Sequence, residues 1–128
     1  MKFTDLKFKQ LENGVGATHT FDNGTTISIQ ASENHYCYPK ENLNSKNDYS
    51  SFEVAVFDID NEFVTKDYIK DADGDVFGWA KRYDIENLME LILIKIREGN
   101  QLEKGLTYAV EKEFITMSQA FEIIRNIK

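Results

Sequence analysis

The sequence predicts an α+β protein: an antiparallel β-sheet packed against two helices in the C-terminal half of the chain. Three observations predict this fold. Alternating polar and apolar residues flank an Asn-Gly pair at 23–24, a very apolar helical segment covers 84–98, and a second helical segment ends the chain. The 128 residues suit a single domain, 1–128, that is long enough to bury its own core.

The strongest strand signal is a hairpin formed by residues 15–21 and 25–31. Asn-Gly tolerates the positive φ angles that a tight hairpin turn requires, and here it lies between the two segments. Polar residues alternate with apolar ones in the second segment, which is typical of a strand with one buried face. An earlier extended segment is marked by Phe3, Leu6 and Phe8.

The middle of the chain combines a long loop with a strand. Residues 32–50 are rich in Asn, Ser, Glu and Lys and show no periodicity, and loops of this length are usually functional or disordered. Residues 52–59 are apolar on both faces, so we expect a central strand. Residues 62–65 are predicted to return as an extended segment, and 71–75 form a polar turn before the extended piece 76–79.

Two helices are predicted in the last third of the chain. Asp84 is a suitable N-cap for a helix that runs to about Glu98 and is ended by Gly99-Asn100. After an extended segment at 106–114, Thr116 and Gln119 match a capping box that opens the last helix.

The helix at 84–98 is apolar around most of its circumference, whereas a helix that covers a sheet needs only one apolar stripe. We therefore expect a second buried contact, made by the last helix or by another subunit of a homo-oligomer.

Charge and cysteine content exclude several classes of protein. The net charge of −7 makes duplex nucleic acid an unsuitable partner. It fits simple solubility or, as a sharper alternative, an acidic surface that imitates nucleic acid. The lone Cys37 allows neither an intramolecular disulfide nor a cysteine metal cage. No signal peptide is seen, and the nearly apolar stretch 88–96 is too short to span a bilayer, so a cytoplasmic location, without membrane attachment, is expected.

Catalytic and metal motifs are not apparent in the sequence. Asp71, Asp73 and Asp75 alternate as calcium ligands do, but the glycine and glutamate of a calcium loop are misplaced. His19 and His35 have no partner at a recognised spacing, and His35 close to Cys37 does not by itself make a catalytic pair. We expect a protein that is not an enzyme and that uses no cofactor and no metal.

Several residues are candidates for binding a small anionic ligand. His35, Tyr36 and Tyr38 offer flat rings for stacking on a base, or alternatively form a plug that packs the loop down. Arg97 and Arg125 end the two helices, where they either complement the helix dipole or grip phosphate. Lys81 and Arg82 form a local basic island just before the first helix.

Two motifs carry a resemblance to a widespread group of small bacteriophage proteins. One is the strand Phe-Glu-Val-Ala-Val-Phe-Asp at 52–58, and the other is Gly-Asp-Val-Phe-Gly-Trp at 74–79, leading into a helix. The resemblance covers about two-thirds of the chain. Among phage proteins of this size, the chain is similar to the first described family of Thoeris anti-defence proteins.

This resemblance implies a multimeric sponge in the cytoplasm of the host bacterium. Proteins of the family bind cyclic ADP-ribose isomers made by host TIR-domain enzymes without cleaving them, and some also hold cyclic oligonucleotides. Their pockets lie between subunits and use arginines of the C-terminal helical part together with aromatics. The resemblance points to Arg97, Arg125 and Trp79 as ligand-binding residues, while the long loop at 32–50 departs from the shorter version in the phage group.

Two other functions remain open from the sequence. The net charge of −7 and an acidic surface suit a protein-binding inhibitor, such as an anti-CRISPR protein; the acidic turns contain Asp58, Asp60, Asp71, Asp73 and Asp75. An enzyme that degrades a nucleotide signal would need His19, His35 or a carboxylate as its base.

Overall fold

The computed structural model describes residues 1–70, 72 and 74–101. It contains a five-stranded antiparallel sheet in the order β1-β2-β3-β4-β5 and two helices, one of them long, which confirms the α+β class. The last predicted strand and helix, 106–114 and 116–128, lie outside the described residues, as does Arg125. The elements are η1 (Phe3–Asp5), β1 (Lys9–Gln10), β2 (Val15–Thr20), β3 (Thr26–Ala31), η2 (Lys46–Asp48), β4 (Phe52–Phe57), α1 (Thr65–Tyr68), β5 (Phe77–Ala80) and α2 (Arg82–Gln101).

The predicted hairpin is confirmed as β2 and β3. The two strands pair in continuous register from Val15 opposite Ala31 to Thr20 opposite Thr26. Gly24 closes the turn with φ of +90°, a conformation that glycine adopts without strain. A Cβ atom at this position would lie 2.6 Å from the side chain of Ile59, so the turn also needs glycine for lack of space.

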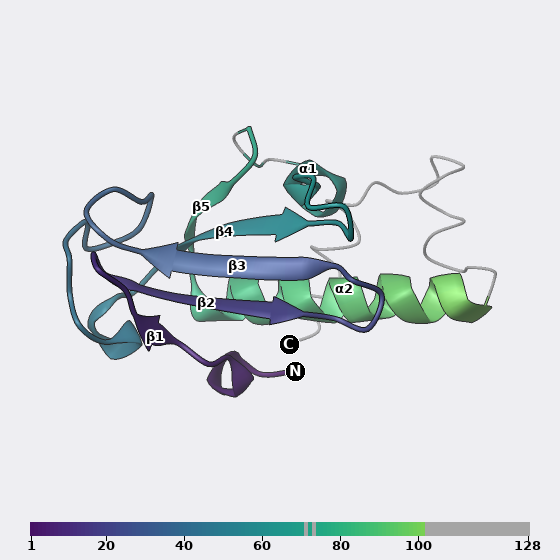
Figure 1. Ribbon diagram of the computed structural model, residues 1–128, viewed down its shortest axis with the longest axis horizontal. Coiled ribbons are helices and arrows are strands. Elements are labelled where there is room, and N and C mark those ends of the chain that lie inside the picture. Colours follow the sequence, from purple (N-terminus) through teal and green to yellow (C-terminus); the bar gives the residue numbers. More distant parts are fainter. Residues whose placement is uncertain (71, 73, 102–128) are drawn as a thin grey trace.

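The core lies between the sheet and α2, which runs along one face of the sheet (Figure 1). In β3 the buried residues alternate with half-buried polar ones, as the period of two predicts. The polar residues face the opposite side of the sheet. The buried members of the three central strands on the α2 side are Val15, Ala17, Ile27, Ile29, Ala31, Phe52, Val54 and Val56.

The prediction of a central strand at 52–59 is confirmed, because β4 pairs with β3 on one side and β5 on the other. The strand ends at Phe57, two residues earlier than predicted. Asp58 closes a turn there: its Oδ1 accepts the backbone N–H groups of Asp60 and Glu62, both at 2.9 Å. A side-chain acceptor of this kind offers the backbone an alternative to the strand ladder.

The predicted extended return at 62–65 is wrong beyond Phe63, which pairs with Phe57 in a single bridge. The short helix α1 begins at Thr65 instead. The Thr65 hydroxyl oxygen accepts the N–H of Val56 at 2.9 Å and donates to the carbonyl of Asp75 at 2.7 Å. The Thr65 side chain thereby satisfies the Val56 N–H, which a further strand would otherwise have bonded.

The helix α2 differs from its prediction at both ends. It begins at Arg82, so Asp84 is not the N-cap but lies in the first turn, where its Oδ2 accepts the Lys81 N–H at 3.0 Å. This is the acidic half of a capping box. The helix continues through Gly99 to Gln101. Gly99 was wrongly predicted to end it: glycine permits a left-handed cap but does not impose one.

The apolar surface of α2 is covered unevenly along its length. Between Ile85 and Ile92 the apolar side chains are fully buried, whereas those that follow are only half-buried. The second buried contact that we predicted for this helix would therefore have to cover its C-terminal half. The fully buried residues are Ile85, Leu88, Met89, Leu91 and Ile92, and the half-buried ones are Leu93, Ile94 and Ile96.

None of the helices in the described part of the chain is long and apolar enough to cross a membrane.

Candidate functional site

The loop at 32–50 is tied down by two buried side chains. Cys37 is 1% exposed and its thiol lies 3.2 Å from the Ser32 carbonyl oxygen. The buried Tyr49 hydroxyl accepts the Leu43 N–H at 2.7 Å and donates to the carbonyl of Glu41. The sequence left two roles open for the aromatic cluster: stacking on a ligand or packing the loop against the fold. Cys37 and Tyr49 pack the loop against the fold, whereas Tyr36 and Tyr38 are exposed.

Tyr36 meets Trp79 on the surface, and we call Tyr36, Trp79 and Lys40 the aromatic ledge. The two rings are tilted by 31° with their centroids 5.3 Å apart. Tyr36 is 43% exposed and Trp79 57% exposed, and the Lys40 ammonium lies 5.1 Å from the centre of the Tyr36 ring. The structure therefore brings two of the predicted ligand residues together and adds a cation that the sequence analysis missed.

The backbone holds the aromatic ledge in place. Trp79 has a φ of +52°, an unusual conformation for a bulky residue, and its N–H donates to the Tyr36 carbonyl at 2.8 Å. Gly78 lies directly under Tyr36, since a Cβ at that position would be 2.7 Å from the Tyr36 Cβ. Gly78, in the middle of β5, is thus what allows the loop to cross the strand so closely.

His35 and Tyr38 flank the aromatic ledge without joining it. The His35 Nδ1 lies 2.6 Å from the Ser32 hydroxyl, and the ring lines a shallow hollow of about 190 Å³ on the sheet face away from α2, together with Glu53 and Phe57. Tyr38 is 66% exposed, and its backbone pairs with Ser51.

The described basic residues that were predicted as ligand contacts do not come together at one site. Arg82 packs inward: its Nη2 donates to the Lys46 carbonyl at 2.9 Å, and its guanidinium lies 5.0 Å from the Phe3 ring centre. It is therefore a packing residue rather than a free phosphate ligand. Lys81 is exposed just before α2. Arg97 is exposed fifteen residues further along α2 than Arg82, a rise of about 22 Å, so one chain does not bring Arg97 to the aromatic ledge.

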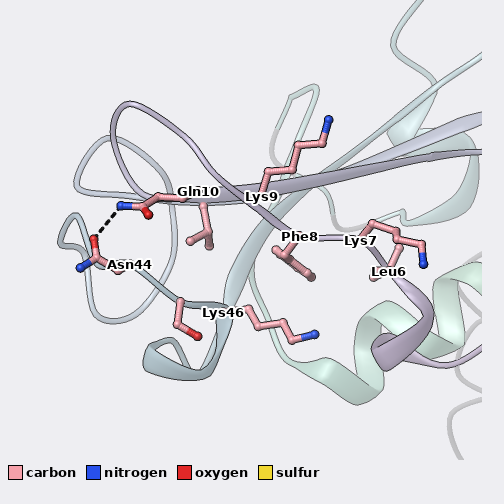
Figure 2. A pocket seen from close by; sticks show the side chains of 9 residues that line it. Leu6, Lys7, Phe8, Lys9, Gln10, Asn44 and Lys46 are labelled. Atoms are coloured by element: carbon pink, nitrogen blue, oxygen red, sulfur yellow. Dashed lines mark hydrogen bonds between the residues drawn. The ribbon is translucent and has the colours of Figure 1, made fainter.

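The sequence analysis also missed a group of lysines at the N-terminal edge of the sheet. Lys7 and Lys9 flank Phe8, and Lys46 of η2 lies nearby (Figure 2). The sequence does show part of this group, because Lys7 and Lys9 stand two residues apart in an extended segment of an acidic chain. Only the fold shows that Lys46 joins them.

Burial raises the pKa of the Cys37 thiol, with the Ser32 carbonyl acting as a weaker, opposing influence. Burial likewise raises the pKa values of Tyr49 and Tyr68. In the unfolded chain each of these groups ionises at a lower pH than in the fold, so the unfolded state loses protons first as pH rises. The free energy of unfolding is therefore expected to fall above about pH 8.5, the ordinary thiol value.

Urea titrations between pH 7 and pH 10 check this expectation. The variant Cys37→Ala should lose less stability than the wild-type protein as the pH passes through 8 to 9, because it lacks the first group to ionise. Equal losses in the two proteins would contradict a role for the thiol.

Comparison with protein-family models, curated proteins and solved structures found no match for this chain. Within the described residues, no group of three or more His, Cys, Asp or Glu side chains is arranged to hold a metal ion. The chemistry that the aromatic ledge offers is stacking by Tyr36 and Trp79 and one positive charge from Lys40.

Proposed function

We propose that this protein is a phage anti-defence protein that binds a cyclic nucleotide immune signal and holds it without cleaving it. The ligand class is a cyclic ADP-ribose isomer or a cyclic oligonucleotide. The observation that carries the proposal is the aromatic ledge, on which Trp79 presents a large exposed ring held in a strained backbone conformation.

Stacking is the interaction that the aromatic ledge supports best. A nucleobase laid on an aromatic side chain gains about 1–3 kcal/mol, whichever base it is. Trp79 offers the larger ring and is the more exposed of the pair, while Tyr36 lies against it. Lys40 places a positive charge within reach of a phosphate group of the same ligand.

The strained conformation of Trp79 favours binding because the ring is held before the ligand arrives. A residue with positive φ persists only where its surroundings hold it, and such residues cluster at ligand clamps. Here the hydrogen bond to the Tyr36 carbonyl and the contact with the Tyr36 ring do so. Because the ring is already fixed, little of the binding free energy is spent on ordering the site when the ligand binds.

A homo-oligomer is part of the proposal. Arg97 lies at the far end of α2 from the aromatic ledge of its own chain, beside the half-buried Ile94 and Ile96. An interface over this half of α2 would cover apolar surface and bring Arg97 of one subunit toward the ledge of another. The guanidinium fork would then grip the phosphate of a ligand whose base lies on Trp79.

Mass spectrometry tests the proposal directly. The protein is purified from cells in which a TIR-domain defence system has been activated, and it is then denatured by heat. We expect release of a cyclic ADP-ribose isomer with unchanged mass, and a lower yield from a parallel preparation of Trp79→Ala. A linear product of changed mass would show that the protein is an enzyme. The same yield from both preparations would show that the aromatic ledge does not bind the ligand.

A protein-binding inhibitor is the second candidate function, and the turn after β4 favours it. Ile59 is 73% exposed there, next to the exposed Asp60, and Phe63 is exposed close by. Asp58 fixes the turn through its two backbone hydrogen bonds. Apolar side chains presented by a fixed acidic turn suit a positively charged protein surface.

Substitution in this turn separates the two candidates. If the target is a protein, Ile59→Arg should abolish inhibition of a defence system in cells, while Trp79→Ala leaves it intact. If the target is a nucleotide, the opposite pattern is expected.

A further inference from the structure

The shallow hollow that His35 lines lies on the face of the sheet away from α2, and we call it the sheet hollow. Its volume is about 190 Å³. It shares no residue with the aromatic ledge. Its lining residues come from β3, β4 and the segments beside them, and they are Ser28, Gln30, His35, Glu53, Ala55, Phe57, Phe63 and Val76.

The register of β3 and β4 explains why the sheet is hollowed here. Ser28 lies opposite Ala55, and Gln30 lies opposite Glu53. Because every second residue of a strand faces the same side, these two pairs are neighbours on one face of the sheet. Phe57 is the next residue of β4 on that face. A pair of small side chains therefore lies between longer ones, which leaves a depression over Ser28 and Ala55.

Gln30 and Glu53 place hydrogen-bonding groups side by side in the sheet hollow. Directly opposed residues of an antiparallel pair have Cβ atoms about 4.5–5.5 Å apart, so the two side chains can reach neighbouring groups of one small ligand. The Glu53 carboxylate offers only acceptors, whereas the Gln30 amide offers donors and an acceptor. Adjacent hydroxyl groups match this pair, since a hydroxyl both donates and accepts. An ammonium group would satisfy the carboxylate but would offer no acceptor to the Gln30 amide.

His35 is held beside these groups by Ser32. The His35 Nδ1 lies 2.6 Å from the Ser32 hydroxyl oxygen, which also accepts the Asn34 N–H at 3.0 Å. Ser32 is 1% exposed, so the hydroxyl is itself fixed by the fold. With Nδ1 engaged, Nε2 is the His35 ring nitrogen that remains for a ligand. The ring is already held and does not have to be ordered when the ligand binds.

Apolar side chains complete the sheet hollow. The Phe57 and Phe63 rings lie with their centroids 4.5 Å apart and are tilted by 42°. Val76, which precedes β5, adds aliphatic surface. Ligand sites of this kind combine apolar walls with a few polar groups that fix the orientation of the ligand. A sugar ring suits both parts, because its C–H groups are apolar and its hydroxyls are paired.

Charge and size narrow the ligand class further. The described residues that line the sheet hollow include one carboxylate and neither lysine nor arginine, so an anionic group would be repelled. Drug-sized ligands occupy pockets of about 300–1,000 Å³, whereas a volume of about 190 Å³ suits a single sugar ring. From these features we infer that the sheet hollow binds a neutral sugar ring, either a free monosaccharide or the ribose of a nucleoside. The inference does not rest on the proposed function, since the two sites share no residue.

NMR titration of the ¹⁵N-labelled full-length protein with D-ribose, D-glucose and D-galactose tests the inference. At least one sugar should shift the amide signals of Ser28, Gln30 and Glu53 saturably. Ser28→Tyr fills the hollow with a residue that strands favour and should abolish binding, whereas Ser28→Ala leaves the hollow open and should retain most of it. Glu53→Gln should weaken binding about tenfold or more, because a hydrogen bond to a charged acceptor is lost. The matched control is Glu12→Gln, which removes an equal charge from an exposed position outside the hollow.

Adenosine distinguishes the two sources of the sugar ring. Tighter binding of adenosine than of any free sugar, abolished in Ser28→Tyr, supports the ribose of a nucleoside, and binding no tighter than that of the best sugar supports a monosaccharide. Trp79→Ala should leave binding of the free sugars unchanged, so the sheet hollow and the aromatic ledge can fail separately. Melting curves show that the variants are folded. No shift at Ser28, Gln30 and Glu53 with any of the four ligands, or unchanged affinity in folded Ser28→Tyr and Glu53→Gln, overturns the inference.

Discussion

Replacing Trp79 by alanine is expected to weaken binding of a cyclic ADP-ribose isomer roughly 5- to 150-fold, the equivalent of losing about 1–3 kcal/mol of stacking. The ring is 57% exposed, so its removal leaves no cavity in the core and the fold should melt as before. Titration calorimetry measures the affinity.

Two controls separate stacking from other effects of the substitution. Trp79→Phe keeps an aromatic face and should retain most of the affinity. Tyr83→Ala removes another exposed aromatic side chain, which lies in α2 outside the aromatic ledge, and should have little effect. If Trp79→Ala binds the ligand as tightly as the wild-type protein, a nucleobase does not stack on this ring.

The largest effect on stability is expected from Ile29→Ala, which should lower the free energy of unfolding by about 2–5 kcal/mol. Ile29 is fully buried in β3, opposite Ala17 of β2 and Val54 of β4. Alanine would leave a cavity between the sheet and α2 that neighbouring strands cannot close. Urea denaturation followed by circular dichroism measures the change.

The neighbouring residue provides a matched control. Ser28 lies on the other face of the same strand and is only half-buried, so Ser28→Ala should change stability by no more than about 0.5 kcal/mol. Similar losses in Ile29→Ala and Ser28→Ala would mean that the core does not lie on the α2 side of β3.

Apolar periodicity and turn residues in the sequence were enough to predict the hairpin and the central strand. The alternation in residues 25–31 and the Asn-Gly pair identified the hairpin, and the two apolar faces of residues 52–59 identified a central strand, which ends at Phe57. The helix α1 could not be predicted in this way, because Thr65 begins it through hydrogen bonds to Val56 and Asp75, which only the folded chain brings close.

The candidate site was predictable only in part, for the same reason. Tyr36 and Trp79 were each candidates, but their contact depends on a loop crossing β5 above Gly78. Arg82 was predicted as a ligand contact because its charge is visible in the sequence, whereas its packing over Phe3 is not. Lys46 lines the same hollow as Lys7 and Lys9, although the sequence keeps it far from them.

Fluorescence can follow stacking on the aromatic ledge directly, because Trp79 is the only tryptophan in the chain. The protein is titrated with a cyclic ADP-ribose isomer while the emission of Trp79 is recorded. Stacking of the adenine on the indole predicts a saturable change in emission that matches the calorimetric affinity. Binding detected by calorimetry without any change in Trp79 emission would show that the ligand lies elsewhere on the protein.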